Sequence, residues 1–216
     1  LALEERERGF SLNRAPLLRL LLVRLEDDRY RLIWTYHHIL MDGWSVSRLI
    51  GEVLRHYSGD EHEPVAAYRD YIDWLGQQVA EASEAFWKGK LANLEGATHL
   101  ARALPVKAPQ AGYHAIYTHL SAGQTRRLQA FAQQQRVTLN TLVQAAWLLL
   151  LQRYTGQRTV TFGATVSGRP ETLNGSENML GLFINTLPVV NSVPTDASVG
   201  DWLREIQAYN LDIRDF

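Results

Sequence analysis

Cysteine is absent from the 216-residue chain, which excludes disulfide bonds, thiol nucleophiles and thiolate metal sites. An excess of positive charge is missing as well, because 22 basic residues stand against 23 acidic ones and the net charge is −1. This balance gives no general attraction for nucleic acid or for an anionic membrane surface. We therefore expect a cytoplasmic protein, without a nucleic-acid partner, whose ligands are neutral or of mixed charge.

Long hydrophobic runs are missing too. Stretches such as "LLRLLLV" and "AAWLLLL" are far shorter than the roughly 20 residues that cross a bilayer. The first residues do not have the pattern of a signal peptide, so we expect no membrane association. The chain begins with Leu1 and stops at Phe216 without a change of composition, and we interpret it as part of a longer protein.

The first half of the chain mixes strand and helix patterns. Apolar strands are predicted at 17–25 and 30–38, joined by an acidic turn into a buried hairpin. Helical spacing follows over 44–59 and again over 65–94, with a second short helix starting near Ser83. The last of these regions is predicted to point five apolar side chains inward: Tyr68, Tyr71, Ile72, Trp74 and Leu75.

A boundary between two lobes is predicted at 95–112, where periodicity is lost and both Pro and Gly occur. The second half again mixes strands with helices, which favours two similar α/β lobes. Its predicted elements are a strand at 113–120, a helix opened by a capping box at Ser121–Gln124, an apolar helix at 139–154 closed by Gly156, strands at 159–166 and 180–190 around a polar loop, and a last helix capped by Ser198.

Residues 35–45, "TYHHILMDGWS", place two histidines, an aspartate and a glycine within an apolar stretch. Burying imidazole and carboxylate costs free energy unless each is hydrogen-bonded or paired, so the cluster indicates a functional site. If the strand runs to residue 38, a period of two sends His37 and His38 to opposite faces, and only one can enter a given cavity. Asp42 and Gly43 then form a turn at the start of a helix.

Three kinds of chemistry compete for this cluster. A metal site of two histidines and a carboxylate is disfavoured, because adjacent strand histidines diverge and no third His or Glu lies at ligand spacing. A serine triad needs a Gly-x-Ser-x-Gly turn, which is absent, and Ser45 lies at an ordinary helix start. We favour an imidazole that acts on a substrate proton, with Asp42 fixing the turn through an arginine and backbone N–H groups.

The stretch "HHILMDG" resembles the His-His-x-x-x-Asp-Gly signature of the condensation domains of nonribosomal peptide synthetases. The resemblance extends, in the family's order, to "FSLNRAPLLR" (10–19), "YRDYIDW" (68–74), "VSGRP" (166–170) and "SENMLGLFINTLPVV" (176–190). It implies an α/β fold, an α+β sandwich of two chloramphenicol-acetyltransferase-like lobes with the active cleft between them. Both lobes are then incomplete: residues 1–105 form the C-terminal part of the N-lobe, and residues 106–216 the N-terminal part of the C-lobe.

The activity implied by this resemblance is amide formation in antibiotic and secondary-metabolite biosynthesis. The amine of a downstream aminoacyl thioester attacks an upstream aminoacyl or peptidyl thioester. Both substrates ride on phosphopantetheine arms of peptidyl carrier domains, in a multidomain synthetase with an adjacent adenylation domain. No cofactor or metal is then bound directly. A non-catalytic recruiting module of the same fold and a coenzyme A-dependent acyltransferase are the alternatives, and we expect the isolated chain to be unstable or inactive.

The resemblance also implies roles for single residues. His38 is the expected catalytic group, as a base or a positioning group, and Gly43 lets the backbone approach the reacting centre. Asp42 pairs in the family with an arginine from an upstream motif that this chain lacks, and Arg169 is the candidate substitute. Asp42 and Gly43 belong with His38 to the expected catalytic set, and the candidates for substrate binding are His37, Trp44, Ser45, Asn185 and Arg169.

Structural readings stand beside these roles. His37 is interpreted as a structural partner, because the predicted strand turns it away from His38. Trp44 is most simply a core aromatic. Asn185 is interpreted as a buried amide that either hydrogen-bonds across the lobe interface or lines the channel.

Overall fold

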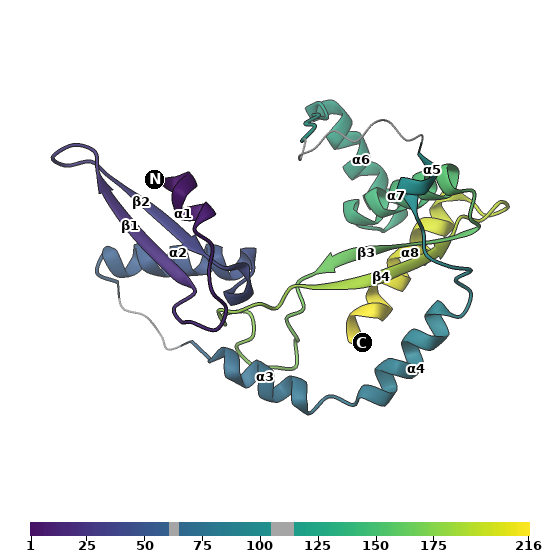
Figure 1. Ribbon diagram of the computed structural model, residues 1–216. Coiled ribbons are helices and arrows are strands. Elements are labelled where there is room, and N and C mark those ends of the chain that lie inside the picture. The colour runs from purple at the N-terminus through teal and green to yellow at the C-terminus, as the bar shows by residue number, and fades with distance from the viewer. Residues whose placement is uncertain (61–64, 105–114) are drawn as a thin grey trace. The chain divides into compact units, whose positions relative to one another are not determined.

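The chain forms two units, each assembled from segments that are distant in sequence, in the computed structural model of this protein (Figure 1). The structure describes residues 1–60, 65–104 and 115–216. Unit 1 consists of Leu1–Gln78 and Ser167–Asn185, and unit 2 of Val79–Val166 and Thr186–Phe216. The lobe boundary predicted between residues 105 and 106 lies outside the described residues and stays a prediction.

Unit 1 begins with helix α1 (Ala2–Glu7) and the hairpin of β1 (Leu18–Arg24) and β2 (Tyr30–Tyr36). The strands are antiparallel, as predicted, with Leu21 opposite Ile33. Two details of the prediction were wrong: β2 ends at Tyr36 rather than at residue 38, and one face of the hairpin is not buried. Four large apolar side chains of the hairpin are exposed: Leu20, Leu22, Tyr30 and Leu32.

Unit 1 continues with a single 3-10 turn, η1 (His38–Leu40), and helices α2 (Gly43–Tyr57) and α3 (Tyr68–Gly76). The side chain of Asp42 caps α2. A small core forms where Tyr71 of α3 packs with Met179 and Phe183, which come from the distant second segment of the unit. The expected inward face of α3 is narrower than predicted, since Ile72 and Leu75 are exposed.

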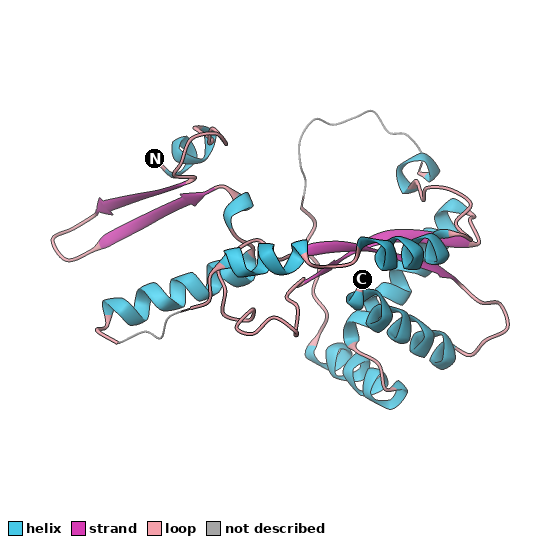
Figure 2. Ribbon diagram, turned by 90° about the horizontal axis from the view of Figure 1, so that it is seen from below, coloured by secondary structure: helices cyan, strands magenta, loops and turns pink. Residues whose placement is uncertain are grey.

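Unit 2 is mainly helical, and its strand pair is a sheet separate from the β1–β2 hairpin (Figure 2). Its elements are α4 (Ala80–Leu91), α5 (Leu100–Ala103), α6 (Ala122–Gln135), α7 (Leu139–Thr155), β3 (Thr159–Val166), β4 (Asn185–Ser192, whose first residue belongs to unit 1), α8 (Val199–Asp212) and the 3-10 turn η2 (Ile213–Asp215).

Most predicted elements of unit 2 are confirmed. The capping box of Ser121 and Gln124 opens α6, and Gly156 ends α7 in the left-handed conformation at φ 72°. Two predictions fail in part: β4 begins at Asn185 rather than at 180, and residues 115–120 form no strand. Residues 113 and 114 of that predicted strand lie outside the described residues.

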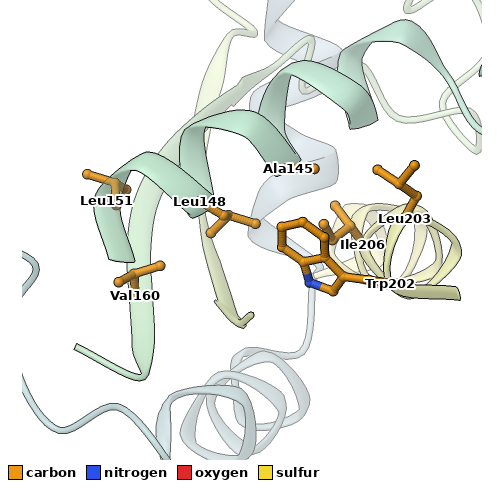
Figure 3. Close-up of a cluster of buried hydrophobic side chains, with 7 residues drawn as sticks. All are labelled: Ala145, Leu148, Leu151, Val160, Trp202, Leu203 and Ile206. Atoms are coloured by element: carbon orange, nitrogen blue, oxygen red, sulfur yellow. The ribbon is translucent and has the colours of Figure 1, made fainter. Parts of the chain in front are cut away.

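The core of unit 2 lies between α7, α8 and β3. Apolar side chains from all three elements point toward one another (Figure 3). Leu148, Val160 and Ile206 are completely buried there. Burial on this scale contributes roughly 1.5–3 kcal/mol for each large side chain, so this cluster stabilises unit 2. In the described part of the chain, no helix is both long and apolar enough to span a membrane.

Candidate functional site

The two histidines lie at the point where β2 gives way to the η1 turn. The backbone N–H of His37 donates to the Leu17 carbonyl at 3.0 Å, which is the last contact of the hairpin here. The His37 ring then accepts, at Nδ1, the backbone N–H of Ile39 at 3.1 Å. His37 therefore acts as the cap of the short turn that carries His38.

The His38 side chain is exposed, and no described residue forms a hydrogen bond, ion pair or ring contact with it. The sequence predicted that the two rings diverge because a strand pleat separates them. The surroundings of the two rings differ for another reason: His37 still has extended backbone, while His38 is the first residue of the 3-10 turn. His38 is thus the imidazole of this pair that is open to an external group.

Asp42 has the opposite character, since its side chain is only 2% exposed. Its Oδ1 accepts the N–H of Ser45 at 2.9 Å, and its Oδ2 accepts the N–H groups of Phe183 and Ile184 at 3.0 and 3.2 Å. Burial raises the pKa of Asp42, but these donors outweigh it, and the pKa lies below the ordinary value of 3.8. The carboxylate is therefore ionised at neutral pH and fully engaged by the protein.

The arginine partner of Asp42 is Arg169, as predicted. Its Nη2 lies 3.8 Å from Asp42 Oδ1, a distance that gives charge compensation without a hydrogen bond. The guanidinium is nearly buried, donates to the carbonyls of Ser176 and Met179, and stacks 4.0 Å from the centre of the Phe183 ring. Burial lowers the pKa of Arg169 while the Asp42 charge opposes this effect.

Ser45 links these groups, a role that sequence reasoning missed. Its buried hydroxyl donates to the Gly181 carbonyl at 2.7 Å and accepts from the Gly181 N–H at 3.1 Å and from Arg169 Nη2 at 2.9 Å. The hydroxyl proton is therefore used inside the protein. Serine at the third position of a capped helix gives no local signal for a partner 136 residues away.

The segment that meets Asp42 and Ser45 runs between β3 and β4 and passes α3 and the start of α2 (Figure 1). Tyr68 of α3 adds a further bond, from its hydroxyl to the Leu182 carbonyl at 2.7 Å. Burial and then the Asp42 charge raise the pKa of Tyr68, so the phenol remains a donor. The backbone polar groups of 181–184 are thus held from both helices, which explains why β4 starts only at Asn185.

The other predicted residues lie at the surface of unit 1. Trp44 is 63% exposed and is not the core aromatic that the sequence suggested. Asn185 is also exposed, so it is not a buried amide. Gly43 occupies the first turn of α2, and a Cβ there would meet no atom within 4 Å. The fold therefore does not itself require glycine at this position.

Chemically, the site combines one accessible imidazole with a buried carboxylate that accepts three backbone N–H groups. It suits proton transfer or hydrogen bonding by His38, with Asp42 and Arg169 fixing the turn. Among the described residues, no group of three or more His, Asp or Glu side chains could hold a metal ion.

Comparison with known proteins gives consistent matches. A family model described as "Condensation domain" matches residues 1–215. A linear gramicidin synthase protein of Brevibacillus parabrevis is 44% identical over 224 residues, which cover 100% of this chain and 4% of that protein. A mycosubtilin synthase protein of Bacillus subtilis is 38% identical over 97% of this chain and 8% of its own length. The chain therefore spans only a small part of these relatives.

Solved structures show the same fold at lower identity. The X-domain from teicoplanin biosynthesis matches with a TM-score of 0.77 and 24% identity, over 97% of this chain and 51% of that one. A four-domain nonribosomal peptide synthetase bound to AMP and glycine also matches with a TM-score of 0.77, at 23% identity, over 96% of this chain and 16% of that one. The predicted fold class is thereby confirmed.

Proposed function

The chain belongs to the condensation-domain family, and from this premise we propose that it forms peptide bonds in nonribosomal peptide synthesis. The substrates are an upstream aminoacyl or peptidyl thioester and the amine of a downstream aminoacyl thioester. Both are delivered on phosphopantetheine arms by peptidyl carrier domains, with an adenylation domain as a further partner. The names of the matched synthetases support this assignment.

The observation that carries the proposal is the contrast between His38 and Asp42. His38 is exposed without a described partner, while the nearby Asp42 is buried and saturated with protein donors. A rigid anchor beside one open imidazole fits a reaction in which one group must meet a substrate proton. We therefore assign substrate contact to His38 and a positioning role to Asp42.

The proposed attack of the amine on the thioester needs only moderate acid–base catalysis. An α-amine has a reference pKa near 8 and a thiol near 8.5, so the attack of the amine on a thioester is feasible at neutral pH. The C–N bond forms, the C–S bond breaks, the amine proton passes to the His38 imidazole and the thiolate remains on its arm. Orientation of the two arms contributes up to roughly 7–11 kcal/mol of barrier lowering. Gly43 and Trp44 lie near His38 in sequence, and we assign them to the substrate surface.

Single-turnover dipeptide formation between two loaded carrier domains tests this proposal, using the full-length protein. His38→Ala is expected to slow product formation by roughly 10²–10⁴-fold if the imidazole transfers the proton. The matched control is His119→Ala, an exposed histidine of unit 2, which should retain the wild-type rate. An unchanged rate in His38→Ala contradicts the assignment, and equal turnover of a coenzyme A thioester donor points to the acyltransferase alternative.

A further inference from the structure

The segment "FSLNRAPLLR" (10–19) contributes only the Leu17 carbonyl to the site described above, and it ends in a side chain with several hydrogen bonds. Arg19 of β1 donates from Nε to Glu5 Oε2, from Nη2 to the Glu5 carbonyl and from Nη1 to the Gly9 carbonyl, each at 2.8 Å. All three guanidinium nitrogens are thus occupied. The Arg19 hydrogen bond lowers the pKa of the Glu5 carboxyl below its ordinary value.

These bonds fold the N-terminal residues back onto the hairpin. The Arg19 guanidinium also stacks on the Phe10 ring, 4.1 Å from its centre. Gly9 allows this return, because its φ of 61° is in the left-handed region that favours glycine. The Phe10 ring is therefore held against Arg19.

Phe10 also contacts His37. The two rings are in edge-to-face contact, with centroids 6.3 Å apart and planes at 89°. His37 in turn caps the η1 turn by accepting the Ile39 N–H. A continuous series of contacts thus runs from Glu5 through Arg19, Phe10 and His37 to the turn that carries His38.

We propose that Arg19 is a positioning residue for the condensation reaction, acting through Phe10 and His37 to fix the turn that presents His38. This inference rests on the proposed function for its kinetic part alone. Arginine is required at this position because its planar fork binds two carbonyls and a carboxylate while stacking on a ring, which an ammonium group cannot do. Arg19 itself does not contact the substrate in this proposal; His38 does.

Hydrogen–deuterium exchange of the full-length protein tests the structural part. In Arg19→Lys and in Phe10→Leu, the peptide spanning residues 36–42 should exchange roughly fivefold faster, because the Ile39 N–H loses a well-placed acceptor. The peptide of α8, residues 199–212, should be unchanged. Arg24→Lys is the matched control, since this arginine lies on the same strand in an exposed pair with Asp27.

Steady-state kinetics with loaded carrier domains test the functional part. Both variants should lower kcat by roughly tenfold with little change in KM, because the catalytic group is misplaced while binding is retained. The double variant should be no slower than the slower single one, since both act through one series of contacts. Arg24→Lys should leave kcat unchanged.

Each outcome decides the proposal. Unchanged exchange at 36–42 in a folded variant overturns it, as does faster exchange with unchanged kcat. A rise in exchange throughout the protein in Arg19→Lys indicates a general structural role of that residue. In that case the exchange at 36–42 and the kcat of Phe10→Leu, which keeps most of the apolar volume, decide the proposal. If the wild-type protein forms no dipeptide, the proposed function fails, while the exchange arm still shows whether Arg19 fixes the turn.

Discussion

The Asp42 carboxylate shows, at the scale of one residue, how a buried charge is made tolerable. Removing an ion from water costs several kcal/mol unless hydrogen bonds and an opposite charge replace the lost solvation. Here three backbone N–H groups and the Arg169 guanidinium supply that replacement. The same bonds join the start of α2 to a segment far away in the sequence, so Asp42 fixes the local structure around the turn.

Asp42→Asn should destabilise the protein by about 2–3 kcal/mol, because one amide group cannot accept from all three N–H groups and leaves Arg169 without its counter-charge. Urea unfolding at neutral pH measures this difference. Asp27→Asn is the control, since that carboxylate is fully exposed and its loss should leave the unfolding free energy nearly unchanged. Equal small losses in both variants would show that the bonds of Asp42 add nothing to stability.

The same carboxylate should make stability depend on pH. Its pKa is lowered in the folded protein, so its contribution is complete above the ordinary value of 3.8 and is lost as the pH falls through the folded value. The difference in unfolding free energy between the wild type and Asp42→Asn should be constant from about pH 7 to 5 and should shrink below about pH 4. A difference that stays constant down to about pH 3 contradicts this.

At the scale of elements, the segment 167–185 is the part that local patterns described least well. "LGLFINTLPVV" alternates like a strand throughout, yet residues 180–184 are irregular because Asp42, Ser45 and Tyr68 take their backbone groups. The helices were predictable, since caps such as Ser121 and Gly156 are local signals. An arginine partner for Asp42 was expected from the residues, and the family resemblance led to Arg169 as the candidate. The Ser45 link depends on a long-range contact and carries no local signal at all.

Close packing in this segment predicts different responses to adding one methyl group. A Cβ at Gly181 would lie 2.0 Å from the Tyr68 ring, so Gly181→Ala should destabilise the protein by about 1–3 kcal/mol. Gly43→Ala should keep the wild-type stability, because nothing lies within 4 Å of the new Cβ. Urea unfolding tests both.

Gly43→Ala is also informative about the substrate. A folded variant with a reduced rate of dipeptide formation supports a close approach of the substrate to this backbone. A folded and fully active variant contradicts the role assigned to Gly43.

At the scale of the whole molecule, closed apolar cores and exposed apolar surface occur together. The core of unit 2 is closed around α7, α8 and β3, while one face of the unit 1 hairpin is open. Leu22 and Leu32 lie directly opposite each other there and are 63% and 53% exposed. Contiguous apolar surface of this kind promotes association between protein molecules.

The isolated 216-residue chain should therefore self-associate as its concentration rises. Leu22→Lys combined with Leu32→Glu should reduce this, because the opposite charges are compatible as a cross-strand pair and remove the apolar surface. Sedimentation velocity measures the effect, and circular dichroism checks that the fold is retained. Glu26→Lys in the hairpin turn replaces the exposed partner of Arg29 but leaves the apolar face intact, so this variant should still associate. Monomeric behaviour of the unmodified chain contradicts the prediction.

The origin of unit 1 from two separated segments also has a consequence for biosynthesis on the ribosome. The Asp42 carboxylate and the Phe183 N–H that satisfies it are 141 residues apart. At a translation rate of about 5–20 residues per second, Phe183 is synthesised roughly 7–28 s after Asp42. During this interval water or a chaperone must solvate the charge, so the turn bearing His38 matures only after most of unit 2 has left the exit tunnel.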